Sequence, residues 1–301
     1  MSPSIAPVND MAAAPARAVK ISFLIPMHNG VELTRACLRS LEETVDLAPH
    51  EVILINDAST DGTAEFLAKL AAPFRIIHNK ERLSYAASIN RGVAEARGEI
   101  LCLLNNDLLF SQDWLPPMLR AFDRFEKVGI VGNVQIDPRN GSYNHMGIVF
   151  TKDAVPIHFG EWFPFRPFRG LTEWKAVTSA CWLVRKSVFL EGGGYNEAYR
   201  NAGYEDVELC LTLGSKGYRH YVANESVIQH FVNSSPGRLQ FESENAQYFR
   251  QRWREHILAQ LTPRECRRCA ANYVLRCLGQ RSHCNRRQLR KALFTLLKCG
   301  H

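Results

Sequence analysis

The residues best suited to chemistry are three small polar side chains that follow an apolar run. Residues 100–104 read Ile-Leu-Cys-Leu-Leu, and Asn105, Asn106 and Asp107 come directly after them. Such a run is typical of a central parallel strand buried on both faces, and open α/β sheets bind ligands at the carboxyl ends of such strands. A carboxylate there can hold a divalent cation, and amides can hydrogen-bond a ribose or phosphate. The alternative is a polar turn that caps a core strand, because Asn and Asp are common in turns.

A second polar loop, which contains Asp57, follows the apolar run at residues 51–55. Strands and helices are predicted to alternate four times: strands at 19–26, 51–55, 74–78 and 100–104, with helices at 31–44, 63–70 and 85–96. This alternation predicts a parallel sheet with helices on both faces. The two loops that carry Asp57 and Asp107 would then line one crevice.

The glycine pattern argues against two common nucleotide-binding classes. The first predicted strand is not followed by Gly-x-Gly-x-x-Gly, and no Gly-rich loop ends in a Walker-type Lys. Dinucleotide oxidoreductases and P-loop ATPases therefore lose support. Any bound phosphates would need a metal ion for neutralisation.

The middle of the chain predicts a hairpin and a long aromatic loop. Residues 128–136 and 144–150 are expected to pair through a turn at Asn140 and Gly141. Residues 151–174 carry interspersed aromatic side chains: Trp162, Phe163, Phe165, Phe168 and Trp174. The segment is either a lid over an acceptor sugar or a hydrophobic flap packed on the core.

A second acidic cluster lies where another helix is expected to begin. Glu205 and Asp206 follow Gly203 and Tyr204. Acidic side chains in the first turn of a helix also interact favourably with the helix dipole, so plain helix capping is the alternative to a chemical role. His230 follows a predicted strand, and a lone His there is more often structural than a ligand.

Four motifs in order resemble the family 2 glycosyltransferases, inverting GT-A enzymes that use nucleotide-diphosphate sugars. The motifs are Ile-Pro-Met-His-Asn (25–29), Asn-Asp-Ala-Ser-Thr-Asp-Gly-Thr (56–63), Leu-Asn-Asn-Asp (104–107) and Tyr-Glu-Asp-Val-Glu-Leu-Cys (204–210). The resemblance covers about residues 19–233. Asn-His-Met-Gly (144–147), Ala-Cys-Trp-Leu-Val-Arg (180–185) and Gly-Gly-Tyr-Asn-Glu (193–197) resemble bacterial members that act on cell-surface polysaccharides.

The resemblance implies a binding site for the donor. Pro26 and Asn29 would lie against the nucleotide, and Asp57 would contact the base or ribose. Asn105, Asn106 and Asp107 occupy the place of the family's Asp-x-Asp motif, and Asn105 or Asn106 would contact the ribose.

The resemblance also implies a metal site and a base. Asp107 would bind Mn²⁺ or Mg²⁺, and His230 would be the second protein ligand. Asp206 would be the catalytic base, with Glu205 beside it as a second catalytic candidate. The expected acceptor is a glycan or a lipid-linked sugar, and the alternative function is a catalytically inactive nucleotide-sugar-binding or scaffold protein.

Two positions depart from the family pattern. Residues 82–85 read Arg-Leu-Ser-Tyr where the family often has Asn-x-Gly-Phe, so the loop near the diphosphate lacks its Gly. Asn196 replaces the Asp of Gly-Gly-Phe-Asp-Glu, which puts any contact made there in doubt.

Charge is concentrated at the C-terminal end. The 301-residue chain carries +7, but residues 250–301 hold 13 Arg and Lys against Glu255 and Glu265, which leaves about −4 for the rest. We expect a disordered tail at 1–18, a GT-A domain at 19–246 and a basic helical extension at 247–301. The extension favours an anionic membrane surface, with a solvated appendage or a dimer contact as alternatives. The acidic balance elsewhere argues against a nucleic acid partner.

Hydrophobic and cysteine patterns complete the prediction. No run of about 18 uncharged apolar residues is present, so we expect no transmembrane helix and a cytoplasmic protein, peripheral on the inner face of the membrane. Cysteines in apolar runs are expected to be reduced core thiols. Cys266, Cys269, Cys277 and Cys284 with His283 invite a zinc interpretation, but their spacing fits no standard finger.

Overall fold

The structure, a computed structural model, describes residues 20–163, 165–232 and 237–298. Four parallel strands form one half of the central sheet: β1 (Ile21–Met27), β2 (Glu51–Asp57), β3 (Phe74–Asn79) and β4 (Ile100–Leu104). The remaining strands of this sheet are β5 (Leu108–Phe110), β6 (Val128–Ile136), β7 (Tyr143–His145), β10 (Leu171–Trp174), β11 (Cys181–Arg185) and β12 (Arg219–His230). The order is β10-β12-β6-β11-β4-β1-β2-β3, with β5 on β12 and β7 on β6.

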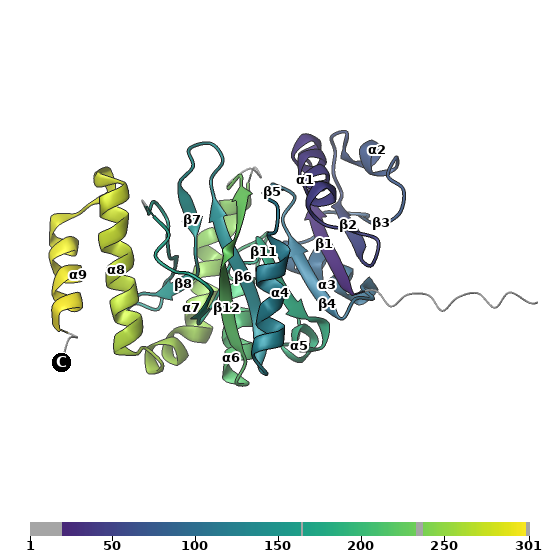
Figure 1. Cartoon of the computed structure of the whole chain (residues 1–301). Helices are drawn as coiled ribbons and strands as arrows, with labels where there is room; N and C mark the ends of the chain where they lie inside the picture. The colour runs from purple at the N-terminus through teal and green to yellow at the C-terminus, as the bar shows by residue number, and fades with distance from the viewer. Residues whose placement is uncertain (1–19, 164, 233–236, 299–301) are drawn as a thin grey trace, which may run out of the picture.

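Helices cover both faces of this sheet (Figure 1). Within the described residues they are α1 (Val31–Thr44), α2 (Thr63–Leu67), α3 (Tyr85–Glu95), α4 (Leu115–Arg124), α5 (Lys186–Glu191), α6 (Glu205–Ser215), α7 (Glu242–Ala259), α8 (Pro263–Gly279) and α9 (Arg286–Lys298). Because side chains alternate along a strand, Leu24 of β1 packs in the core on the α3 and α6 side. Phe23 and Ile25 pack in the core on the α1 and α4 side. The result is the predicted α/β/α sandwich.

The parallel strands follow the prediction closely, and the other half of the sheet is more mixed. β6 and β12 are parallel to each other, but β11 lies antiparallel between β4 and β6. The alternation of strands and helices that predicted parallel pairing ends after β4, so this pattern could not predict the inserted antiparallel strand.

The predicted hairpin is only partly correct. β6 pairs with β7 in antiparallel fashion as expected. Residues 148–150 form β8 (Ile148–Phe150), which pairs with β9 (Pro156–His158) rather than with β6. Gly147 turns the chain out of the sheet with φ of 129°, and a Cβ there would overlap the ring of Trp174. This backbone conformation and this space suit only glycine.

The aromatic segment is largely a packed flap. Phe163 and Trp174 are each only 3% exposed, and Phe168 packs on the same cluster. Phe165, at 50%, is the member of the set that faces solvent. These contacts favour the flap over the lid for the buried members.

The C-terminal helices pack onto the rest of the chain. α7 buries Phe249 and Ile257 in the core on the α3 side, and α8 contacts β8. α8 and α9 lie at the end of the molecule opposite β3 and α2 (Figure 1). The domain division at residue 246 stays a prediction, and the tail at 1–18 lies outside the described residues. In the part of the chain that the structure describes, no helix is long and apolar enough to cross a membrane.

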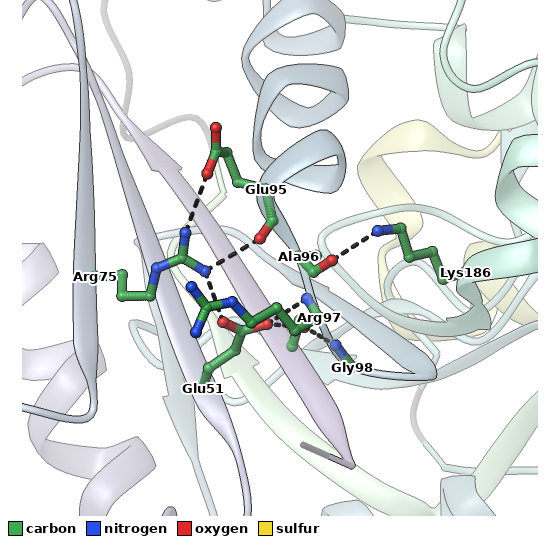
Figure 2. Close-up of polar contacts among 8 residues, drawn as sticks. Glu51, Arg75, Glu95, Ala96, Arg97, Gly98 and Lys186 are labelled. Carbon is green, nitrogen blue, oxygen red and sulfur yellow. Dashed lines mark hydrogen bonds and ion pairs between the residues drawn. The ribbon is translucent and has the colours of Figure 1, made fainter. Parts of the chain in front are cut away.

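A buried carboxylate joins the amino ends of the parallel strands. The carboxylate of Glu51 on β2 accepts hydrogen bonds from Ser22 Oγ at 2.6 Å, Arg97 N at 2.6 Å and Arg75 Nη1 at 2.8 Å. Arg75 also pairs with Glu95, and Figure 2 shows these groups converging on Glu51 from β3 and the turn after α3. Burial alone would raise the pKa of Glu51, but the hydrogen bonds outweigh it and the pKa lies below its usual value.

We expect Glu51→Gln to lower the free energy of unfolding at pH 7 by about 1.5–3 kcal/mol, because the charge-assisted hydrogen bonds are weakened. A group whose pKa is depressed by folding stabilises above its unfolded pKa of about 4.3 and loses this effect as pH falls through the folded value. The difference between the two proteins, measured by urea unfolding, should therefore shrink below about pH 4. Glu95→Gln removes the exposed partner of the same Arg75 and should cost less than about 1 kcal/mol.

Candidate functional site

A cavity of about 360 Å³ lies at the carboxyl ends of the parallel strands. Eight of the nine predicted site residues line it: Pro26, Asp57, Asn105, Asn106, Asp107, Glu205, Asp206 and His230. These residues span more than two hundred positions of the chain. The structure therefore brings together the residues that the motifs singled out.

Asn29, the ninth predicted residue, lies outside the cavity lining and bonds to the loop after β2. Its side-chain oxygen accepts hydrogen bonds from Thr60 N at 2.7 Å and Asp61 N at 3.3 Å, and its own N–H donates to Ser59 Oγ at 2.9 Å. The residue joins the loop after β1 to the loop after β2. Asn29 is not part of the cavity lining, so a direct nucleotide contact stays a prediction.

Asp57 is fixed at one end of the cavity. Its Oδ1 accepts from Asn79 Nδ2 at 2.7 Å and from Leu83 N at 2.8 Å. Leu83 belongs to the stretch that lacks the family's Gly, and the next residue, Ser84, caps α3 by accepting from Ala87 N at 3.1 Å. The loop thus reaches the aspartate through its backbone without that glycine.

Asn105 and Asn106 link the end of β4 to its neighbours. Asn106 Nδ2 donates to Thr34 Oγ1 on α1 at 3.0 Å, and Asn105 Oδ1 accepts from Tyr85 Oη at 3.4 Å. The backbone N–H of Asn105 donates to Ala180 O at 2.9 Å. These contacts hold the polar loop at the cavity wall.

Asp107 and His230 face each other across 3.3 Å, from Oδ1 to Nε2. Both are buried, and neither of these two atoms has a hydrogen-bond partner among the described residues. His230 Nδ1 lies 2.8 Å from Gln135 Oε1, which is an acceptor, so Nδ1 carries the proton and Nε2 offers a lone pair. Two opposed acceptor atoms in a buried place fit a cation.

The described residues hold no group of three or more His, Cys, Asp or Glu side chains that could bind a metal. A metal at Asp107 and His230 would therefore have two protein ligands, as expected for hard ions whose other ligands are substrate phosphates and water. The same finding gives no support to a zinc site in the C-terminal cysteines within the described part of the tail.

Asp206 and Glu205 point in different directions at the start of α6. Asp206 Oδ2 accepts from Ser179 N at 2.9 Å, and the residue is partly exposed in the cavity. Glu205 is 4% exposed and turns back to accept from Gly203 N. Asp206 is therefore positioned by the Ser179 backbone at the cavity, and Glu205 occupies the capping position.

Tyr204, the residue directly before α6, has a left-handed conformation with φ of 75°. This conformation is unfavourable for a bulky residue and is found mainly where the surroundings enforce it. Its hydroxyl donates to Glu242 Oε1 at 3.1 Å, and burial together with Glu242 raises its pKa to about 12. The neutral ring is held at the cavity wall beside Asp206.

Several lining residues were not predicted: His158, Ser179, Tyr204 and Glu242. Ser179 adjoins the recognised motif at 180–185, and Tyr204 is the first residue of the motif at 204–210. His158 and Glu242 lie outside every motif and carried no signal in the sequence.

Comparison with known proteins gives the family. A model described as glycosyl transferase family 2 matches residues 22–193, more than half of the chain. The chain belongs to glycosyltransferase family 2.

The relatives of this family 2 chain include bacterial polysaccharide proteins, as predicted. It is 30% identical to the O-antigen biosynthesis protein RfbC of Myxococcus xanthus over 77% of this chain and 19% of that protein. It is 24% identical to an N-acetylglucosaminyl-diphospho-decaprenol L-rhamnosyltransferase of Mycobacterium tuberculosis over 62% of this chain and 68% of that protein. An uncharacterized Sinorhizobium fredii protein, y4gI, is 27% identical over 79% of this chain and 28% of its own length. The chain thus spans only 19% and 28% of RfbC and y4gI.

Solved structures confirm the GT-A fold. GalNAc-T7, crystallised with UDP, GalNAc and Mn²⁺, superposes with a TM-score of 0.59 at 15% identity over 71% of this chain and 44% of that one. The mannosyltransferase PcManGT of Pyrobaculum calidifontis, with GDP-Man and Mn²⁺, gives 0.57 at 18% identity over 97% and 79%.

Proposed function

We propose that this family 2 glycosyltransferase is an inverting enzyme that moves a sugar from a nucleotide-diphosphate donor to a hydroxyl group of a glycan or lipid-linked acceptor. The observation that carries the proposal is that Asp57, the facing pair Asp107 and His230, and Asp206 all line one cavity. The relatives that act in O-antigen and lipid-linked sugar synthesis support cell-surface polysaccharide as the product.

Asp206 would act as the base. Its carboxylate takes the proton from the acceptor hydroxyl while that oxygen attacks the anomeric carbon from the face opposite the diphosphate. The new carbon–oxygen bond forms as the bond to the donor phosphate breaks, and the nucleoside diphosphate leaves with the electron pair. One such displacement inverts the anomeric centre.

Asp107 and His230 would hold the metal, and Asp57 would hold the nucleoside. Mn²⁺ or Mg²⁺ bound there would supply Lewis acid stabilisation for the charge on the leaving diphosphate. The two structural neighbours that contain Mn²⁺ support a divalent ion. Asp57 is suited to accept a hydrogen bond from the base or ribose because its carboxylate is already fixed by Asn79 and Leu83.

A thermal-shift screen of UDP- and GDP-sugars, with and without Mn²⁺, tests the donor site. A ligand that binds only the folded state raises the melting temperature, so the true donor should do so in a metal-dependent way. The hits are then assayed for transfer and hydrolysis. Stabilisation without either reaction over an acceptor panel would favour the inactive binding protein, and no stabilisation by any nucleotide sugar would contradict the proposal.

We further propose that α8 and α9 bind an anionic membrane surface, with the enzyme peripheral on the cytoplasmic face. Residues 266–301 contain nine Arg and Lys and no Asp or Glu. Four large apolar side chains in this region are exposed: Leu278 at 65%, Leu293 at 42%, Phe294 at 56% and Leu297 at 78%. Exposed apolar groups among many cations match an anionic lipid surface, where each nearby cation contributes about 1 kcal/mol.

Leu297→Glu should lower binding to vesicles that contain phosphatidylglycerol by about tenfold or more, because the apolar contact of one leucine with the acyl region is lost. Vesicle flotation measures this, and added salt should weaken binding by the unmodified protein. Leu190→Glu, at an exposed position of α5, is the matched control and should bind normally. Equal flotation of both variants, or a dimer that shields α9 and binds no vesicles, would contradict the membrane proposal.

A further inference from the structure

The cavity continues past Asp206 to a wall that the donor site does not use. The β8–β9 hairpin supplies Ile148, Pro156, Ile157 and His158 to this wall. Along the edge of the sheet the order is β2, β1, β4, β11 and then β6 with β7. The backbone N–H of Met146, directly after β7, donates to Phe159 O, directly after β9, at 2.7 Å. The hairpin wall therefore lies at the opposite end of the cavity from Asp57.

His158 on this wall is paired with a second histidine behind it. His145 Nδ1 and His158 Nδ1 are 3.0 Å apart. His145 is 1% exposed, whereas His158 is exposed and lines the cavity. Burial, with His158 and His230 nearby, lowers the pKa of His145 well below its usual value, so this ring is neutral at pH 7.

The surroundings of the pair determine which nitrogens carry protons. His145 Nε2 accepts from Thr178 N at 3.5 Å, which places the proton of His145 on Nδ1. That Nδ1–H donates to His158 Nδ1, so the proton of neutral His158 lies on Nε2. The orientation and tautomer of His158 are therefore set by a buried partner, as a binding group requires.

The same framework connects the pair to the base and to the C-terminal helices. Thr178 precedes Ser179, whose N–H donates to Asp206. Asn272 of α8 donates to His158 O at 3.1 Å and accepts from Gly160 N at 3.1 Å. The wall is thus fixed on both sides, against the loop that positions Asp206 and against α8.

We propose that this wall is the acceptor subsite, where His158 Nε2–H donates a hydrogen bond to an oxygen of the acceptor sugar and the sugar ring packs on Ile157 and Pro156. His145 is the positioning residue that acts through His158. The proposal rests on the proposed function, because a separate acceptor subsite has meaning only if the chain transfers sugar. Sugars present both polar edges and apolar faces, which is the combination that this wall offers.

His158→Ala tests the acceptor contact, with Lys152→Ala in the exposed turn of the same hairpin as the control. Binding of a panel of methyl glycosides in the presence of UDP and Mn²⁺ is measured by saturation-transfer NMR, and the apparent KM is measured for any glycoside that is glycosylated. We expect His158→Ala to weaken glycoside binding or raise KM at least tenfold, with UDP affinity unchanged within twofold. His158→Gln, which keeps an N–H donor, should recover part of the loss. Unchanged glycoside binding and KM in His158→Ala would overturn the proposal.

The tautomer provides a test that requires no acceptor. In ¹⁵N-labelled unmodified protein at pH 7, long-range ¹H–¹⁵N spectra should show His145 protonated on Nδ1 and His158 protonated on Nε2. The opposite arrangement on His158 would overturn the proposal. Failure of the proposed function looks different, because it would abolish UDP-sugar binding or turnover in the unmodified protein while leaving these spectra as expected.

Discussion

Asp206→Asn is expected to lower the rate of sugar transfer by about 10² to 10⁴ while donor binding stays within about twofold, because base catalysis is typically of this size. Asn has the same shape and keeps an oxygen that can accept from Ser179 N, but it cannot take the acceptor proton. The change should therefore appear in kcat and leave the melting temperature nearly unchanged.

Glu205→Gln is the matched control for this experiment. Glu205 is buried and bonded to Gly203 N, so its replacement should lower the free energy of unfolding more than the turnover of the folded protein. Kinetics and urea unfolding on both variants separate the two roles. Near-normal turnover in Asp206→Asn would remove that residue from the mechanism, and a selective loss of kcat in Glu205→Gln would transfer the role to its neighbour.

Asp107→Ala should reduce Mn²⁺ affinity at least tenfold to a hundredfold, the size of effect that even indirect metal partners have, and should reduce transfer accordingly. The two proposed ligand atoms, Asp107 Oδ1 and His230 Nε2, lie 3.3 Å apart. The variant keeps only His230 Nε2, so one of the two protein ligands would be lost. Electron paramagnetic resonance of Mn²⁺ with UDP measures the affinity without any turnover.

Asp137→Asn is the control for Asp107→Ala. Asp137 is also buried at 7% exposure, but its carboxylate is bound by Arg139 Nη2 at 2.6 Å and it is not part of the cavity lining. Mn²⁺ affinity should stay near normal in this variant. Equal affinity in Asp107→Ala and the unmodified protein would exclude Asp107 as a ligand.

The periodicity of apolar residues in the sequence was sufficient to predict the strands and helices of the parallel half of the fold. The predicted helix at 31–44 and the strand at 100–104 coincide with α1 and β4. Both have a single strong pattern, a helical repeat in one and an uninterrupted apolar run in the other. The rule that loops at the carboxyl ends of parallel strands share an edge then placed Asp57 and Asp107 in one cavity.

The other half of the molecule depends on contacts that no local pattern encodes. The positions of β11 and of the β8–β9 hairpin are set by pairing between distant segments and by the backbone freedom of Gly147. The roles of Glu51 and Asn29 arise from hydrogen bonds to residues 24 or more positions away in the chain. His158 is visible as a lining residue only once β9 is folded against β8.

Asn272 of α8 forms hydrogen bonds with the backbone on both sides of Phe159, donating to His158 O and accepting from Gly160 N. Through these bonds α8 supports the cavity wall that the β8–β9 hairpin forms. A Cβ at Gly279 would collide with Trp162 O, so α8 rests directly on the chain that follows this wall. The C-terminal helices therefore cannot be exchanged between relatives as an independent module. A chimaera that kept every motif would still change the shape of the cavity, unless the new helix carried an equivalent of Asn272 and a glycine at the position of Gly279.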